Sequence, residues 1–213
     1  MDLRSLNQLV RQGEGERLEF KLKTNHPEKI IREIVAFANT AGGKLLVGID
    51  DSGEVKGLKH PDGDLFVLNK AINTLCFPQI PYTVERIGVG NEKEILVYHI
   101  AHSPDKPHYV QSEDGKKIVY IRVDDRSVKA SREVYQIMQR SGNHRDVKFS
   151  YGEKEQKLMQ MLDKNPSVTV DSFSQLAGIP RKTASRTLVL LVLANVLEVH
   201  PGDMADQFTR VAI

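Results

Sequence analysis

Residues 37–54 read Phe37-Ala-Asn-Thr-Ala-Gly-Gly-Lys-Leu-Leu-Val-Gly-Ile-Asp50-Asp51-Ser-Gly-Glu54, and this stretch decides the fold. Apolar residues recur at helical spacing from Ile30 to Ala41, behind a Pro27 that is well placed in a first helical turn. Gly42-Gly43 ends that helix, and Lys44 to Ile49 is a short apolar run typical of an interior strand. The stretch therefore predicts a helix, a buried strand and a turn at Asp51 to Gly53.

Further helices and strands on either side of this stretch mix without regular alternation. Helical spacing covers 2–12, 65–75 and 131–140, and strand patterns cover 18–22, 82–88, 93–100 and 118–123. In the first of these strands Leu18, Phe20 and Leu22 alternate with charged residues, so we expect one buried face and one charged outward face. The order predicts an α+β domain with a mixed sheet rather than a doubly wound one.

A change of character after residue 141 indicates a second domain. Ser141 to Asp146 is polar, contains glycine and has no periodicity, so we place the boundary there, between domains 1–141 and 150–213. Helices are predicted at 153–163, from a cap at Asp171 to Gly178, and from Pro180 towards Val196. Strand-like residues 196–200 and 207–211 follow, and this order is that of a small winged helix-turn-helix domain.

The third of these helices has a basic beginning and an apolar end. Arg181, Lys182, Ser185 and Arg186 lie opposite the expected core positions Ala184, Leu188 and Leu191, where they could contact DNA as a recognition helix does. The alternative is a helical bundle that mediates assembly and solvates these residues. Residues 188–197 are apolar nearly all round, so we expect them to pack on the first domain or to form a homo-oligomer.

Several separated motifs of the first domain resemble one known family. These are Glu14-Gly-Glu-Arg-Leu-Glu19-Phe-Lys21, residues 37–51, Pro107-His-Tyr and Tyr120-Ile-Arg-Val, in that order. Together they resemble the Schlafen AlbA-like domain (AlbA_2), over about residues 14–133. The resemblance implies a nucleic-acid-binding module.

The same resemblance raises the possibility of an enzyme, because nuclease members of the Schlafen group use three acidic residues. The matching positions are Glu14, Glu19 and Asp50, with Asp51 as an open alternative to Asp50. Three such carboxylates could hold Mg²⁺ or Mn²⁺ for phosphodiester hydrolysis. The alternative is that all three are solvated surface groups of a binding domain.

Basic residues of the first domain are further candidates for contact with nucleic acid: Lys21, Arg122, Arg126 and Lys129. The chain departs from the family pattern here, because Asp124 and Asp125 stand where members carry a Gly-Ser-Ser type of turn. Two added negative charges weaken the case for a phosphate-binding face. Gly42-Gly43-Lys44 is not a phosphate loop, because Leu45 follows the lysine, and we expect no ATP site.

Composition limits the functions that the chain can have. The 213 residues carry a formal net charge of +2, so any nucleic-acid site must be local. The single cysteine, Cys76, lies at helical spacing behind Ile72 and is expected to be a buried thiol. The first residues lack the pattern of a secretory signal and no apolar run is long enough for a bilayer, so we expect a cytoplasmic protein with no membrane contact.

The sequence thus predicts a prokaryotic DNA-binding transcriptional regulator that uses a winged helix and needs no cofactor for DNA binding. DNA is the expected partner and RNA the second choice. The alternative is a metal-dependent endoribonuclease using Glu14, Glu19 and Asp50. A scaffold that binds only protein is a third reading.

Overall fold

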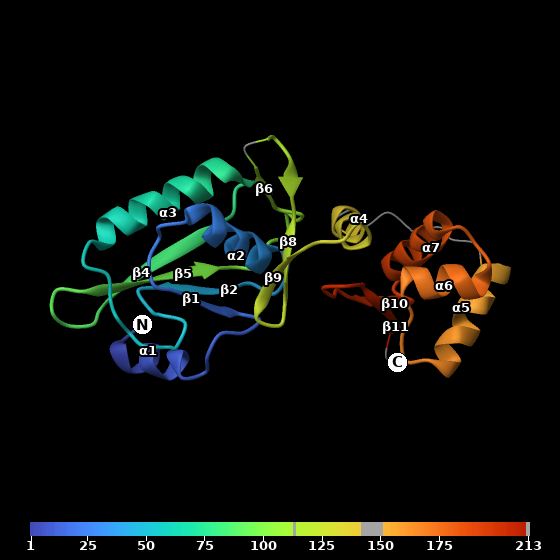
Figure 1. The fold of residues 1–213 in the computed structure, drawn as a ribbon, viewed down its shortest axis with the longest axis horizontal. Helices are drawn as coiled ribbons and strands as arrows, with labels where there is room; N and C mark the ends of the chain where they lie inside the picture. The colour runs from blue at the N-terminus through green and yellow to red at the C-terminus, as the bar shows by residue number, and fades with distance from the viewer. Residues whose placement is uncertain (113, 142–150, 212–213) are drawn as a thin grey trace. The chain divides into compact units, whose positions relative to one another are not determined.

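A computed structural model describes residues 1–112, 114–141 and 151–211 and divides the chain into two compact units. The first unit is Met1–Lys129 and the second is Ala130–Ile213 (Figure 1). Helices and strands are mixed in both, so the predicted α+β class is confirmed.

A four-stranded mixed sheet organises the first unit, in the order β1 (Leu18–Lys21), β2 (Gly43–Val47), β5 (Glu94–Ile100) and β4 (Tyr82–Gly88). The β1–β2 pair is parallel, because helix α2 (Pro27–Asn39) crosses over between them. The other two pairs are antiparallel. The buried strand predicted after Gly42-Gly43 is therefore the interior strand β2.

Each face of this sheet is covered by helices. Helices α2 and α3 (Pro61–Leu75) pack on one face, with Phe37, Leu45 and Tyr98 in the shared core. The short helix α1 (Leu3–Val10) packs on the other, with Leu6 and Val10 against Leu46 and Val97. Because α1 has only eight residues, it covers part of its face and leaves the rest open.

Short strands complete the first unit. They form a three-stranded sheet of β3 (Cys76–Phe77), β6 (Tyr109–Gln111) and β7 (Lys117–Ile118) and a hairpin of β8 (Tyr120–Val123) and β9 (Arg126–Lys129). The buried Asn39 ties them to α2: its side-chain amide donates to the carbonyls of His108 and Tyr120 and accepts from the His108 N–H. Cys76 is buried as predicted, and burial raises the pKa of its thiol to about 12.

The second unit contains α4 (Arg132–Ser141), α5 (Glu153–Lys164), α6 (Val170–Ala177), α7 (Arg181–Leu193) and the antiparallel pair β10 (Leu197–His200) and β11 (Gln207–Arg210). Its core includes Leu158, Phe173, Leu188 and Phe208. Helix α6 is capped by the Thr169 side chain and not by Asp171, which lies in the first turn. Within the residues that the structure describes, no helix is long and apolar enough to cross a bilayer.

Helix α4 differs from the expectation that residues 131–140 close the first domain. Its Ile137 belongs to the core of the second unit, and α4 packs along α7. An apolar helix such as α7 needs cover on more than one side, and α6 and α4 both contact it. The surface that led us to expect a homo-oligomer is thus largely covered within one unit. The boundary expected at 142–149 lies outside the described residues.

Candidate nucleic-acid interface

The turn between α6 and α7 sets the position of the basic residues on α7. Gly178 ends α6 with a positive φ of 66°, a conformation that glycine adopts without strain. Pro180 directly precedes α7, and the Ser174 hydroxyl donates to the carbonyl of Ile179 inside the turn. The beginning of α7 is therefore held firmly against α6.

Arg181, Lys182 and Arg186 are all exposed on the first half of α7. The Arg181 Nε donates to Asp171 Oδ1 at 2.7 Å, and both side chains remain more than 60% exposed. An ion pair as exposed as this one is weak, so Arg181 can exchange Asp171 for another anion. Within the described part of the chain, Lys182 and Arg186 make no ion pair or side-chain hydrogen bond.

Ser185 does not share this surface, contrary to the sequence expectation. It is buried, and its hydroxyl donates to Glu133 Oε1 of α4 at 2.5 Å. Ser185 lies on the edge of the basic stripe nearest to α4, so the packing of that helix removes it from solvent. Its role in the structure is to satisfy a buried carboxylate.

Arg122 is buried in the first unit, contrary to the expectation that it contacts nucleic acid. Its side chain is completely buried, and its Nη1 contacts Glu19 Oε2 at 2.9 Å and Glu33 Oε2 at 2.6 Å. Its Nη2 donates to the carbonyl of Gly15 at 2.6 Å, and the guanidinium lies over the ring of Phe37. Arg122 is thus a structural ion that cannot contact a phosphate.

Glu19 is buried by the same network, which overturns the expectation of a charged outward face on its strand. It points to the α2 side of the sheet, where it also pairs with Lys21. Lys21 is half-buried and donates to the carbonyl of Phe20 as well. By contrast, Arg126 and Lys129 are exposed on β9.

The three candidate carboxylates have separate environments. The Glu14 carboxylate accepts the Phe20 N–H at 2.8 Å, and its pKa is raised by partial burial, with repulsion from Glu19 and Asp51 adding to the effect. Asp50 accepts the Ser52 hydroxyl and the N–H groups of Ser52 and Glu54, and these bonds lower its pKa. Asp51 is therefore an aspartate whose charge acts on Glu14.

These three carboxylates are not arranged to bind a divalent metal ion together. Glu19 is already neutralised by Arg122 and Lys21, and the Asp50 Oδ1 is used within its own turn. Across residues 1–112, 114–141 and 151–211, no three His, Cys, Asp or Glu side chains are grouped to hold a metal ion.

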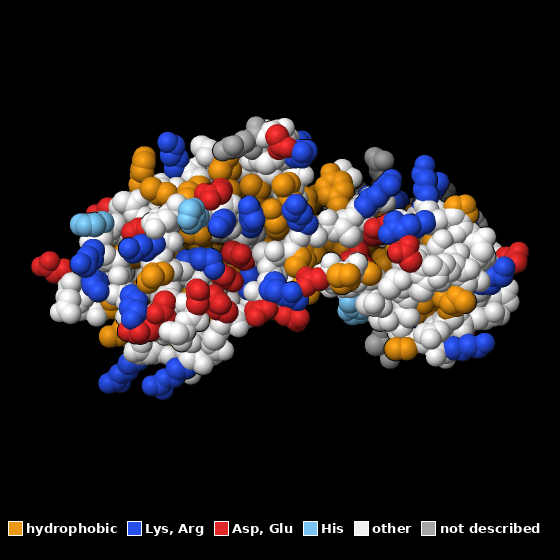
Figure 2. Space-filling model, in the orientation of Figure 1, with side chains coloured by type: hydrophobic (Ala, Val, Ile, Leu, Met, Phe, Trp, Pro, Cys, Tyr) orange, Lys and Arg blue, Asp and Glu red, His pale blue; other side chains and the backbone are white. Residues whose placement is uncertain are grey.

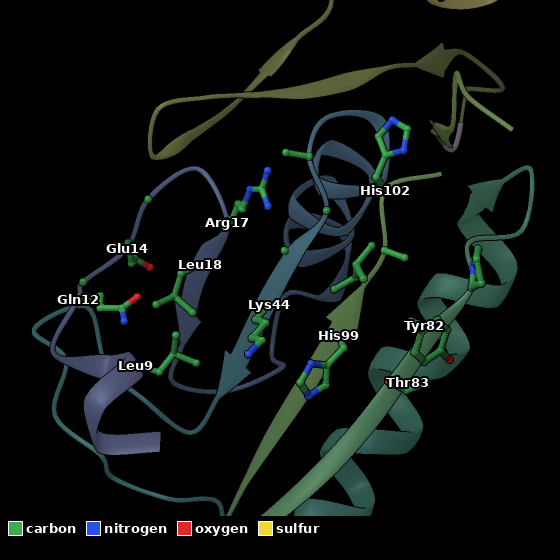
Figure 3. Close-up of a pocket in the computed structure, with 18 residues that line it drawn as sticks. Leu9, Gln12, Glu14, Arg17, Leu18, Lys44, Tyr82, Thr83, His99 and His102 are labelled. Carbon is green, nitrogen blue, oxygen red and sulfur yellow. The ribbon is translucent and has the colours of Figure 1, made fainter. Parts of the chain in front are cut away.

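A groove that the sequence did not predict lies on the α1 side of the first unit. It has a volume of about 790 Å³ and opens where β1 and β2 begin and β5 ends (Figure 3). Lys44 and His99 lie opposite each other on neighbouring strands of its floor, and Glu14, Arg17 and His102 stand around it. Because cross-strand register brings these residues together, no local sequence pattern marks them.

The imidazole of His99 in this groove has a lowered pKa, which favours its uncharged form. Burial and the neighbouring Lys44 lower the pKa of His99, whose Nε2 lies 3.1 Å from Glu85 Oε2. The His102 Nε2 accepts a hydrogen bond from Lys106 Nζ at 3.0 Å. The positive charge of the groove comes from Arg17 and Lys44.

The chain matches the sequence model of a known family. The sequence model of the Schlafen AlbA_2 family matches residues 14–131. Among solved structures, the amino-terminal domain of a RecG-related protein from Nitrosomonas europaea is similar, with 24% identity and a TM-score of 0.45, covering 53% of this chain and 82% of that one. The DIP2311 protein from Corynebacterium diphtheriae shows 20% identity and a TM-score of 0.43, covering 70% of this chain and 29% of that one. Scores below 0.5 indicate nothing about what this chain binds.

Proposed function

The chain belongs to the Schlafen AlbA_2 family, a family of nucleic-acid-binding domains, and we propose that it is a DNA-binding transcriptional regulator. The observation that carries the proposal is the exposed basic surface of α7, made of Arg181, Lys182 and Arg186. We propose that the second unit acts as a winged helix, with α7 in the major groove and the β10–β11 pair as the wing.

The charge distribution supports a local site. Lys and Arg side chains are mixed with Asp and Glu over the visible face of the molecule (Figure 2), in line with the net charge of +2. Nonspecific attraction to a polyanion is therefore weak, and binding depends on where the unpaired cations stand. Lys182 and Arg186 are free to displace counterions from phosphates, and Arg181 joins them once it leaves Asp171.

The proposal predicts a specific loss in a Lys182→Ala, Arg186→Ala double variant. Duplex DNA affinity should fall, and the slope of log K against log salt should decrease by about two, one for each lost phosphate contact. Fluorescence anisotropy over a salt series measures both quantities. Lys164→Ala is the matched control, because Lys164 is an exposed lysine of the same unit on α5.

Two outcomes would contradict this function. Equal affinity of the double variant and the control would remove α7 from the interface. Enrichment of a random duplex library without any preferred sequence would reject sequence-specific regulation while leaving nucleic-acid binding intact. The homo-oligomer expectation stays a separate prediction, which sedimentation of the full chain tests.

A further inference from the structure

The mixed sheet of the first unit has two edge strands, β1 and β4, whose outward backbone groups are satisfied differently (Figure 1). On β1 the Phe20 N–H donates to the Glu14 carboxylate at 2.8 Å, and the Phe20 carbonyl accepts from Lys21 Nζ at 2.9 Å. Leu18 exchanges backbone hydrogen bonds with Gly15. The outward groups of β1 are therefore used within the chain, which closes this edge to a further strand.

Hydrogen bonding in the hairpin of β4 and β5 shows which groups of β4 point outward. The Val89 N–H donates to the Lys93 carbonyl at 2.9 Å beside the turn. In an antiparallel ladder, hydrogen-bonded pairs alternate with non-hydrogen-bonded pairs. The residues of β4 that bond to β5 are therefore every second one along the register, Thr83, Glu85 and Ile87. The residues between them direct their N–H and C=O groups away from β5: Tyr82, Val84 and Arg86.

These outward groups of β4 are free. Among the residues that the structure describes, no backbone or side-chain group bonds to the N–H or C=O of Val84 or Arg86. Strand β4 has seven residues and contains no proline. Its Arg86 side chain is held by Glu94 of β5 and by Asp62 of α3, so it is not free to cap the edge. An exposed edge strand of this length is a template for pairing with another strand.

Strand β4 is complementary to itself in one antiparallel register. A two-fold axis at Val84 places Val84 opposite Val84 of a second copy, Tyr82 opposite Arg86, and Thr83 opposite Glu85. Residues with outward backbone groups then meet each other, as the ladder requires, and each charged side chain lies opposite an aromatic ring or a hydroxyl. An axis at Glu85 or at Arg86 would instead set two like charges directly opposite each other, which destabilises a sheet.

We propose that two copies of this chain pair antiparallel through β4 and join their four-stranded sheets into one continuous sheet. Tyr82 and Val84 pack on the α2 and α3 side of the sheet and Ile87 packs on the α1 side, so a two-fold axis perpendicular to the sheet keeps both faces continuous. Assembly stops at two chains, because the edges that remain are two copies of the closed strand β1. This dimer needs no nucleic acid and differs from the homo-oligomer expected through residues 188–197.

Sedimentation of the full chain at micromolar concentration should give the mass of two chains, and Val84→Pro should give the mass of one. Proline removes the outward N–H of residue 84 but no hydrogen bond within the chain, and edge strands tolerate proline at such positions. Circular dichroism checks that the variant is folded. Val84→Thr is the matched control: it keeps the N–H and the β-branched shape and should remain a dimer. A monomeric wild type, a folded Val84→Pro that stays dimeric, or a series of larger species would overturn the proposal.

Disulfide cross-linking tests the register without the proline variant. Residues of a hydrogen-bonded antiparallel pair lie about 5.5 Å apart between Cα atoms, which is within disulfide reach. Val84→Cys should therefore form an intermolecular disulfide on mild oxidation. Arg86→Cys should not, because Arg86 lies opposite Tyr82 and the two copies of residue 86 are separated by about 14 Å along the strands.

The native cysteine does not interfere with this cross-linking, because Cys76 is buried and the pKa of its thiol is raised to about 12. Non-reducing electrophoresis of dilute protein measures the cross-linked fraction. Absence of the Val84→Cys disulfide, or equal cross-linking of Val84→Cys and Arg86→Cys, would overturn the proposed pairing.

Discussion

At the scale of single residues, Arg122 shows why a basic residue in a strand motif is not by itself a phosphate ligand. It neutralises Glu19 and Glu33, which lie 103 and 89 positions away in the sequence. Burial raises the pKa of Glu33, and the neighbouring Glu19 raises it further. The arginine is therefore the cation that compensates the charge of the buried Glu19 and of the partly buried Glu33.

Arg122→Met should destabilise the first unit by about 3–5 kcal/mol, because it leaves the partly buried Glu33 without its arginine and the buried Glu19 with Lys21 alone. Urea unfolding followed by circular dichroism measures the loss. Lys129→Met, an exposed lysine of the next strand, should stay within about 0.5 kcal/mol of the wild type. Adding Glu19→Gln and Glu33→Gln to Arg122→Met should restore part of the stability; a triple variant less stable than Arg122→Met would refute this account.

Glu19 also decides between binding and catalysis. Because Arg122 and Lys21 already neutralise its carboxylate, we expect RNA to stay intact when incubated with excess protein and Mn²⁺ or Mg²⁺. Gel analysis of a labelled RNA measures cleavage. Cleavage by the wild type that disappears in Glu19→Gln, with the variant still folded, would establish the nuclease alternative with Glu14, Glu19 and Asp50 or Asp51.

At the scale of elements, α4 is joined to the turn between β10 and β11 through a buried carboxyl group. Asp206 accepts the hydroxyl of Ser131, which also accepts the Val134 N–H in the first turn of α4. Burial raises the pKa of Asp206 above its ordinary value of 3.8, so the folded state binds this proton more tightly than the unfolded state. The contribution of Asp206 to stability is greatest below pH 3.8 and is lost as pH rises through the folded pKa.

Asp206→Asn removes this titration. The free energy of unfolding of the variant, minus that of the wild type, should therefore be larger at pH 7 than at pH 4. Denaturant unfolding of the second unit at the two pH values measures the difference. Glu198→Gln, an exposed site on β10, is the comparison. If the difference in unfolding free energy between Asp206→Asn and the wild type is the same at pH 4 and pH 7, the pKa of Asp206 is not raised in the folded state and the prediction is wrong.

At the scale of the whole molecule, the two units present unpaired cations of different kinds. Lys182 and Arg186 stand on the exposed half of α7, whereas Lys44 stands on the floor of a groove in the first unit. Substitutions on α7 therefore leave the side chains of the groove unchanged.

The sequence by itself determined the elements and the family. Helical and alternating periodicity placed α2, α3, α5 and α7 and strands β2, β4 and β5, because these patterns depend only on neighbours along the chain. It also led to the family, through motifs whose order along residues 14–131 is part of the signal. The exposed start of α7 follows from the same local spacing.

Only the tertiary structure decided which side of each pattern is buried and by what. Periodicity defines a face but not what packs on it. Local sequence patterns therefore could not predict that α4 belongs to the second unit, that α4 buries Ser185, or that distant glutamates enclose Arg122. The groove at Lys44 arises from strand register and from the shortness of α1. Each of these depends on contacts between residues far apart in the chain, and such contacts set the burial and the charge environment of a side chain.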